Sequence, residues 1–269
     1  MKRLMQWLGR NGHRPGRAHA VTLPLCIVRH FDRGSAQAEC YRGLRTALEL
    51  VGQSSPFRTL VVTSPGVQEG KTTTLINLAV LFWELGRRVL VVDSDLRRGC
   101  LHRVFGVPRA PGLTDLVLGK ADTLYPVHDL KPGFSIMTRG SQYDKPGVLL
   151  GSPALRQALA LFQSRADIIL MDSSPLLPVS DTLKLALATD AVLLVLRAGH
   201  TPRRDAAQVR KLLQASRANV LGVVLNGMQE HGRRRYGYDR YYSVVDPFGE
   251  GDSLHGEGAS TVERLERFS

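Results

Sequence analysis

Short, continuous apolar runs alternate along the middle of the chain with segments of helical periodicity, and this alternation constrains the fold more than any other feature. Such runs are typical of strands buried on both faces, as in parallel sheets. The sequence predicts strands at 58–63, 88–92, 134–137, 167–171, 191–196 and 220–225. It predicts helices at 35–50, 71–85, 153–163 and 204–214. We therefore expect an α/β fold, with a mostly parallel central sheet covered by helices on both faces.

Composition excludes several classes of protein. The chain has 269 residues, of which 43% are hydrophobic, and so much apolar content excludes disorder throughout. Apolar runs such as 191–196 are far shorter than the roughly 20 residues of a membrane-spanning helix. The 3 cysteines are too widely spaced for a disulfide framework or a Cys-based zinc site, which indicates a reducing cytosol. The formal charge of +12 indicates an anionic partner: nucleic acid, a membrane surface or a phosphorylated ligand.

Charge and periodicity divide the chain into three parts. Residues 1–34 are predicted to be a flexible basic leader, or alternatively a short membrane-surface anchor. Residues 35–228 are predicted to form the folded domain, and residues 229–269 a flexible C-terminal tail because the apolar pattern disappears there. The tail holds a cluster of four tyrosines, Tyr236, Tyr238, Tyr241 and Tyr242. With the neighbouring arginines these side chains could also form a stacking patch for nucleic acid.

The segment SPGVQEGKTTT, residues 64–74, lies between the first predicted strand and the helix after it. A loop in this position places backbone N–H groups around an anion at the positive end of the helix dipole. Lys71 can then reach the β- and γ-phosphates of a nucleotide, and the Thr72 hydroxyl can ligate Mg²⁺. This is the core of a P-loop, although Pro65 stands where the usual pattern has Gly. The residues predicted to bind the nucleotide here are Glu69, Gly70, Lys71, Thr72 and Thr73.

Three carboxylates follow two of the predicted strands. Asp93 and Asp95 come after the strand at 88–92, and Asp172 ends the strand at 167–171. The carboxyl ends of strands line the ligand crevice of an open parallel sheet, so these side chains can converge on the phosphate loop. Each aspartate taken singly could instead cap a helix. Together they predict a Mg²⁺–nucleotide site in which Thr72, Asp93 and Asp172 hold the metal.

Over roughly residues 36–242 the sequence resembles the bacterial tyrosine kinases of capsule and exopolysaccharide synthesis, a family of P-loop ATPases related to the cell-division and chromosome-partition ATPases. Three motifs carry the resemblance: the Walker A loop at 64–72, VVDSDLR at 91–97, and the Walker B-like segment at 172–181. The resemblance implies the P-loop NTPase fold, with ATP and Mg²⁺ as cofactors. It also implies ATP-dependent autophosphorylation on tyrosine in a neighbouring subunit, which regulates polysaccharide synthesis and export.

Two further features match the family. Glu39, Arg42 and Arg45 fit its Glu-x-x-Arg-x-x-Arg pattern, so the resemblance implies that the helix at 35–50 mediates ring-shaped self-association. Charges three residues apart lie close together on a helix and could form salt bridges between subunits, although an ordinary solvated face has the same pattern. The tyrosine cluster of the tail corresponds to the family's autophosphorylation sites.

The resemblance also assigns roles at the site. Lys71, Asp93, Asp95 and Asp172 form the expected catalytic set, with Asp93 as the acceptor of the tyrosine proton, but the residues alone do not separate base from metal ligand. Asn226 ends a strand and corresponds to an adenine contact in this ATPase class, or it is simply a polar strand end.

Partners and location follow from the same resemblance. We expect a homo-oligomer, an integral-membrane adaptor and a phosphotyrosine phosphatase as partners, and no nucleic acid. The protein is then cytoplasmic and associated with the inner face of the membrane through the adaptor. The alternatives are a positioning ATPase of the partition or division type, and an ATP-binding scaffold without kinase activity. Gly66 stands where positioning ATPases usually carry a lysine, which favours the kinase.

Several positions depart from the family pattern. Val67 and Ser174 stand where the family usually has proline, and Gly99 replaces the proline of an Arg-Pro pair. A glutamate of the family's Asn-Pro-x-Glu turn is replaced by Val148. None of these changes removes a direct phosphate or metal ligand.

Overall fold

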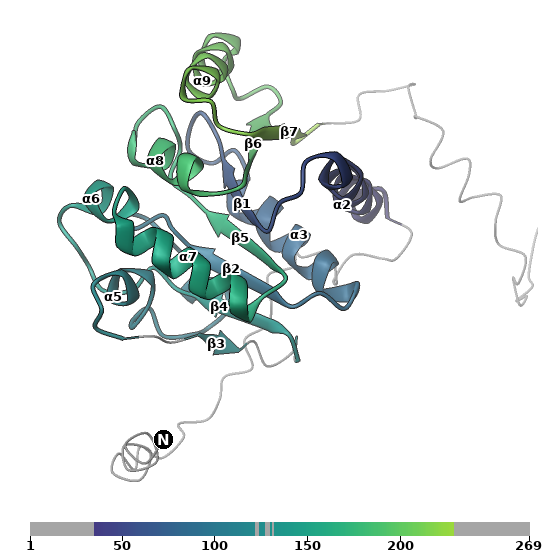
Figure 1. Ribbon diagram of the computed structural model, residues 1–269. Helices are drawn as coiled ribbons and strands as arrows, with labels where there is room; N and C mark the ends of the chain where they lie inside the picture. The colour runs from purple at the N-terminus through teal and green to yellow at the C-terminus, as the bar shows by residue number, and fades with distance from the viewer. Residues whose placement is uncertain (1–34, 122–123, 127–129, 131, 229–269) are drawn as a thin grey trace, which may run out of the picture. The chain divides into compact units, whose positions relative to one another are not determined.

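The computed structural model describes residues 35–121, 124–126, 130 and 132–228, which form a twisted sheet between two layers of helices (Figure 1). Seven strands form the sheet in the order β3-β4-β2-β5-β1-β6-β7. Neighbouring strands run parallel, except that β3 is antiparallel to β4. The strands are β1 (Thr59–Thr63), β2 (Val89–Asp93), β3 (Tyr125–Pro126), β4 (Phe134–Met137), β5 (Ile168–Asp172), β6 (Ala191–Arg197) and β7 (Val220–Asn226).

The helices lie on both faces of this sheet (Figure 1). They are α2 (Ala36–Ser54), α3 (Lys71–Glu84), α4 (Leu101–Val104), α5 (Leu113–Val117), α6 (Pro146–Leu150), α7 (Pro153–Arg165), α8 (Asp181–Ala188) and α9 (Arg203–Ser216). Within the described ranges, no helix combines the length and the apolar character that crossing a membrane requires.

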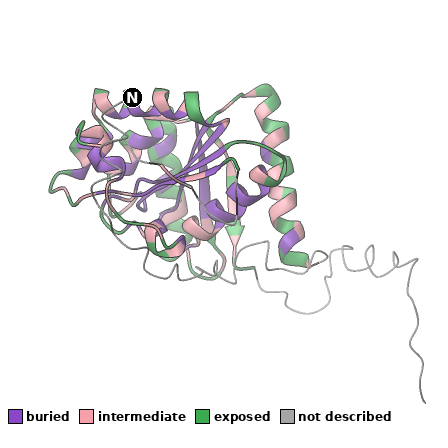
Figure 2. Cartoon of the chain, turned by 90° about the horizontal axis from the view of Figure 1, so that it is seen from below, coloured by how far each residue is buried: buried purple, intermediate pink, exposed green. Residues whose placement is uncertain are grey.

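Two apolar cores hold the layers together because successive side chains of a strand point to opposite faces. In β1, Leu60 and Val62 pack with α2 and α3, whereas Val61 packs with α7, α8 and α9. The inner strands β1, β2 and β5 are buried at every position, as the central strands in Figure 2 show. The parallel α/β architecture expected from the sequence is therefore confirmed.

All six predicted strands and all four predicted helices are present, with ends shifted by a few residues. The two-residue strand β3 and the short helices α4, α5, α6 and α8 were not predicted, because segments of two to eight residues show too little periodicity. The strand β7 also differs from the expectation that helices cover the sheet on both faces. It lies at the edge of the sheet, and Val223 and Leu225 are more than half exposed.

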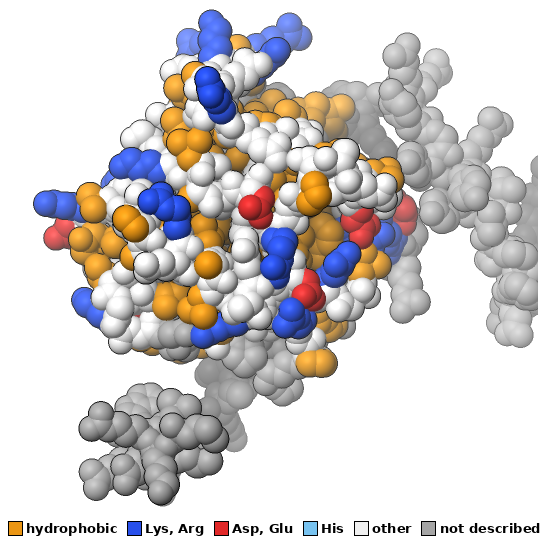
Figure 3. Space-filling view, viewed as in Figure 1, with side chains coloured by type: hydrophobic (Ala, Val, Ile, Leu, Met, Phe, Trp, Pro, Cys, Tyr) orange, Lys and Arg blue, Asp and Glu red, His pale blue; other side chains and the backbone are white. Residues whose placement is uncertain are grey.

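Basic side chains are spread over the surface and gather over α9, at the top of Figure 3. This helix carries four exposed basic residues, Arg203, Arg204, Arg210 and Lys211. Part of the overall positive charge therefore lies on an ordinary solvated helix face. The predicted leader 1–34 and tail 229–269, including the four tyrosines, lie outside the described residues, and the domain boundaries stay predictions.

Candidate active site

The loop between β1 and α3 makes a sharp turn that is held by hydrogen bonds within the loop. Gln68 and Gly70 both have positive φ, 60° and 96°, which turns the chain sharply before α3 begins. Only glycine fits at position 70, because a Cβ there would lie 2.0 Å from Asn226 Nδ2. The Ser64 hydroxyl donates to Gly66 O at 2.6 Å. The loop thus has the shape that a phosphate-binding turn requires, at the N-terminus of α3.

The Glu69 side chain holds this loop in place through hydrogen bonds, which we call the brace. It is 2% exposed, and its two carboxylate oxygens accept from the Gly66 N–H at 3.1 Å and the Thr201 hydroxyl at 2.7 Å. Arg197 Nη1 donates to Gln68 O at 3.0 Å and attaches the loop to the end of β6. Because its carboxylate is used in this way, the predicted contact of Glu69 with a nucleotide would fall to its backbone N–H. Sequence reasoning missed the brace.

Most of the predicted nucleotide-binding residues lie together. Gly70, Lys71, Thr72, Thr73 and Asn226 line one open hollow of about 360 Å³ beside the loop. Asn226 Nδ2 donates to the Glu69 carbonyl oxygen at 3.0 Å, which fixes the side chain at the end of β7 against the loop. The hollow is polar and lies at the positive end of α3, so it suits a phosphorylated ligand.

Asp93 and Asp172 are register partners at the ends of β2 and β5. Both are buried, at 0% and 2% exposure. Asp172 Oδ2 accepts from the Thr72 hydroxyl at 2.6 Å, and Asp93 Oδ2 accepts from the Leu101 N–H at 3.1 Å. The other oxygen of each carboxylate, Oδ1, is buried without a hydrogen-bond partner among the described residues.

The electrostatics of this pair are unfavourable in the free protein. Burial, followed by the nearby charge of Asp172, raises the pKa of Asp93 well above its ordinary value. Burial raises the pKa of Asp172 to about 6, although the Thr72 hydrogen bond and the charge of Lys71 act in the opposite direction. Two buried like charges with free oxygens are the environment that a bound cation would stabilise.

These residues fit Mg²⁺. The two unpartnered carboxylate oxygens and the Thr72 hydroxyl are hard oxygen donors, which Mg²⁺ prefers. This ion is usually bound by one or two carboxylates together with substrate phosphates. Within the described part of the chain, no group of three or more His, Cys, Asp and Glu side chains is arranged to hold a metal.

Asp95 lies beside the pair but is engaged in the turn after β2. Its Oδ1 accepts from the Ser174 hydroxyl at 2.7 Å and from the backbone N–H groups of Arg97 and Arg98 at 3.2 and 2.9 Å. Ser174 stands where the family usually has a proline, and a proline has no hydroxyl for this bond. The departure therefore has a structural role, and the catalytic role of Asp95 stays a prediction.

Gly99 is a further part of the site that the sequence did not reveal. A Cβ at this position would lie 2.0 Å from Asp93 Oδ1, so the bare backbone packs against the carboxylate. Arg139 Nη1 holds the same loop through the carbonyl oxygens of Arg97 and Leu96, at 2.8 and 3.4 Å. The one signal in the sequence was the glycine in place of the family's proline.

The predicted oligomerisation residues pair within their own helix. Arg42 forms an ion pair with Glu39, and Arg45 Nε lies 3.5 Å from Glu49 Oε2. Their role between subunits stays a prediction. The predicted phosphorylation sites lie outside the described residues: Tyr236, Tyr238, Tyr241 and Tyr242.

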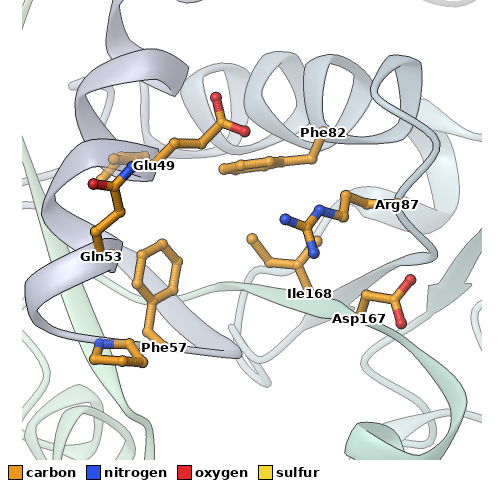
Figure 4. Close-up of a pocket in the computed structure, with 10 residues that line it drawn as sticks. Glu49, Gln53, Phe57, Phe82, Arg87, Asp167 and Ile168 are labelled. Atoms are coloured by element: carbon orange, nitrogen blue, oxygen red, sulfur yellow. The ribbon is translucent and has the colours of Figure 1, made fainter.

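A second hollow, of about 380 Å³, lies near the opposite ends of the strands, between α2 and α3 (Figure 4). Phe57 and Phe82 line it together with Arg87 and Asp167. None of the predicted site residues lines this hollow.

A family model described as the CobQ/CobB/MinD/ParA nucleotide-binding domain matches residues 60–246. The protein YwqD of Bacillus subtilis, a tyrosine-protein kinase, is 30% identical over 223 residues, which are 82% of this chain and 93% of YwqD. EpsB of Ralstonia solanacearum is 36% identical over 205 residues, which are 76% of this chain but only 27% of EpsB. The chain thus spans about a quarter of that longer relative.

Among solved structures, the kinase domain of the Escherichia coli tyrosine kinase Etk has the same fold. It aligns with a TM-score of 0.73 and 28% sequence identity, over 86% of this chain and 90% of that domain. The similarity therefore extends over nearly the whole of the Etk domain.

Proposed function

We propose the function of this protein from one premise: the chain belongs to the CobQ/CobB/MinD/ParA nucleotide-binding family and, within it, to the bacterial tyrosine-protein kinases. It transfers the γ-phosphate of ATP to tyrosines in the tail of a neighbouring copy of itself. The observation that carries the proposal is the buried pair Asp93 and Asp172, each with an unpartnered oxygen, beside Lys71 and Thr72.

Each of these residues has a task in phosphoryl transfer. Lys71 and the loop N–H groups hold and align the phosphates, because transfer depends on alignment and charge neutralisation. Thr72, Asp93 and Asp172 would hold Mg²⁺, which would supply neutralisation of the charge on the transferred phosphate. Asp93 accepts the proton of the tyrosine hydroxyl as the transfer proceeds.

The cellular role is inferred from the same family. The kinase regulates exopolysaccharide or capsule synthesis and export, in line with the resemblance on which the sequence interpretation rests. It acts as a homo-oligomer assembled through Glu39, Arg42 and Arg45, at the inner face of the membrane through an integral-membrane adaptor. A phosphotyrosine phosphatase reverses the modification.

The test is incubation of the full chain with labelled ATP and Mg²⁺. Label should enter tyrosine in the wild type and disappear in Lys71→Met, because the phosphates lose their positive partner. It should also disappear when the four tail tyrosines are changed to Phe. Lys211→Met, which removes an exposed lysine from α9, is the matched control and should keep the label.

The outcomes separate the competing functions. Hydrolysis of ATP without labelled tyrosine would favour a positioning ATPase, and nucleotide binding with neither reaction would favour a scaffold. Either result would contradict the kinase. Labelling that survives Lys71→Met would show that the phosphate loop is not the site of transfer.

A further inference from the structure

A larger cleft adjoins the nucleotide hollow and shares Gln68 and Lys71 with it. Its volume is about 910 Å³, and Lys71 and Asp95 are among the residues that line it. Four arginines contribute to its lining: Arg98, Arg103, Arg109 and Arg139. Arg98 lies in the loop after β2 and Arg103 in α4, whereas Arg109 and Arg139 lie in the segments that follow α4 and β4. Elements far apart in the sequence therefore place positive charge around one space, which we name the arginine cleft.

The arginines of the cleft are not engaged in ion pairs with acidic side chains of the described residues. Among the described residues, none of the four arginines forms an ion pair, and Arg98, Arg103 and Arg109 are exposed. The preceding residue provides a contrast, because Arg97 is paired with Asp181 at 2.8 Å and does not line the cleft.

Asp95 and His102 also line the arginine cleft. Asp95 is the one carboxylate in the lining, and its Oδ1 already accepts three hydrogen bonds. Burial and then the charges of Arg139, Arg103 and Arg109 lower the pKa of His102, so these positive charges act on one place. His102 Nδ1 is buried and has no hydrogen-bond partner within the described residues. The cleft is therefore suited to a strongly anionic group.

The phosphates of ATP do not account for this charge. They are expected in the hollow lined by Gly70, Thr72, Thr73 and Asn226, and none of the four arginines lines that hollow. Gln68 and Lys71 line both spaces, so an anion in the cleft would lie next to the phosphates of a bound nucleotide. Arginine binds phosphate through paired N–H donors, and clusters of arginine are a common way to recognise phosphorylated peptides.

We propose that the arginine cleft binds a phosphotyrosyl group already present on the peptide segment whose next tyrosine is being phosphorylated; this rests on the proposed kinase function. The predicted acceptor segment suits such an arrangement, because its tyrosines are one to six residues apart. An extended chain rises about 3.3 Å per residue, so tyrosines two or three residues apart are separated by about 7 to 10 Å. The product of one transfer would then hold the substrate for the next.

The test measures peptide binding to the full chain saturated with ADP and Mg²⁺, so that the phosphate loop is filled and no transfer occurs. The probe is a fluorescent peptide of residues 234–243 that carries phosphate on Tyr238, and it is compared with the unphosphorylated peptide. We expect the phosphorylated peptide to bind at least about tenfold more tightly, as charge-assisted hydrogen bonds of this kind imply.

Paired variants locate the binding. Arg103→Gln with Arg109→Gln should abolish the preference for the phosphorylated peptide. The matched control, Arg203→Gln with Arg210→Gln, removes the same charge from α9 and should retain the preference. Equal loss in both double variants would overturn the proposal, because it would mean that only overall charge matters.

Two further arms define the ligand. A peptide with Tyr238→Glu should bind no better than the unphosphorylated one, and inorganic phosphate at the concentration of the peptide should not displace the probe. Equal binding of the glutamate peptide, or displacement by phosphate, would overturn the phosphotyrosyl assignment. The outcome is independent of the kinase assay. Phosphopeptide binding without any labelled tyrosine would contradict the proposed function and leave the cleft assignment intact, whereas labelled tyrosine without phosphopeptide preference would do the reverse.

Discussion

The neighbouring strands β2 and β5 carry charged residues at both ends. One end holds a pair of opposite charges and the other a pair of like charges. Just before the strands begin, Arg88 and Asp167 form an exposed ion pair, with Arg88 Nη2 2.7 Å from Asp167 Oδ1. Hydrogen bonds from the Arg88 side chain and backbone lower the pKa of Asp167 to about 2. Where the strands end, Asp93 and Asp172 lie side by side with like charge, buried and incompletely bonded, and their pKa values are raised.

This difference separates a structural ion pair, Arg88 with Asp167, from a candidate ligand-binding site at Asp93 and Asp172. At the start of the strands Arg88 and Asp167 neutralise each other, so this pair needs no added ion. At their end, the unfolded chain would solvate carboxylates that the folded chain leaves buried. The fold therefore loses some stability at the edge where the proposed cation and phosphates would restore it.

The largest expected effect comes from breaking the buried pair. Asp93→Asn should lower the rate of tyrosine phosphorylation by at least about 100-fold, because the proposed proton acceptor is lost. Its unfolding temperature should stay the same or rise, because a buried charge is removed. Initial rates and calorimetry at pH 7.5 measure the two effects.

Asp167→Asn, at the other end of the strands, is the control for this variant and should keep full activity. If Asp93→Asn kept most of the wild-type rate, the carboxylate would not be the proton acceptor.

The next effect is on the pH dependence of stability. The pKa of Asp172 rises from an ordinary value of 3.8 in the unfolded chain to about 6 in the fold. The folded state therefore binds the proton more tightly, and stability falls as pH increases from about 4 to 6 and stays low above 6. Relative to Asp172→Asn, the wild type should lose about 3 kcal/mol of unfolding free energy across this range.

Denaturant titrations of both proteins at pH 4, 5, 6 and 7 measure the difference. A constant gap between the two curves at all four values would mean that Asp172 has an ordinary pKa.

A smaller effect is expected when Gly99, which packs against Asp93, is changed. Gly99→Ala places a Cβ against Asp93 Oδ1, so the loop must shift, at a cost of about 1 to 3 kcal/mol in unfolding free energy. Stabilisation by Mg²⁺ with ADP should weaken as well. Thermal unfolding with and without the ligands measures both quantities.

Gly43→Ala is the matched control, since nothing lies within 4 Å of its added Cβ in the exposed part of α2. It should be stabilising by about 0.5 to 1 kcal/mol. Similar destabilisation by both alanines would indicate that the contact with Asp93 is not the cause.

The smallest effect belongs to the exposed pair. Asp167→Asn should lower the melting temperature by at most a few °C, because surface ion pairs contribute little. The lowered pKa of Asp167 means that its contribution is present above about pH 4 and is lost as pH falls towards 2. Melting curves at pH 7 and pH 3 test this. A large loss of stability or of kinase activity would remove the contrast between the two ends.

The parts of the molecule that the sequence revealed are those whose signal is local. Apolar runs identified the buried strands, and the strand–loop–helix order around Lys71 identified the phosphate loop. Asp93 and Asp172 could be placed together because parallel strands bring their carboxyl ends to one edge.

What the sequence could not reveal depends on how loops and distant residues meet in space. The brace from Glu69 to Thr201 joins residues 132 positions apart. The approach of Gly99 to Asp93 and the gathering of four arginines depend on how loops cross at the edge of the sheet. No periodicity or motif records such crossings, so they become visible only in the structure.

The brace at Glu69 has a consequence for the speed of nucleotide capture. A loop whose backbone is already held has little conformational entropy left to lose when phosphates arrive. Collision, rather than rearrangement of the loop, would then limit how fast ATP binds. The same hydrogen bonds couple the turn at 198–201 to the loop. Any contact that displaces Thr201 also releases the carboxylate that holds Gly66.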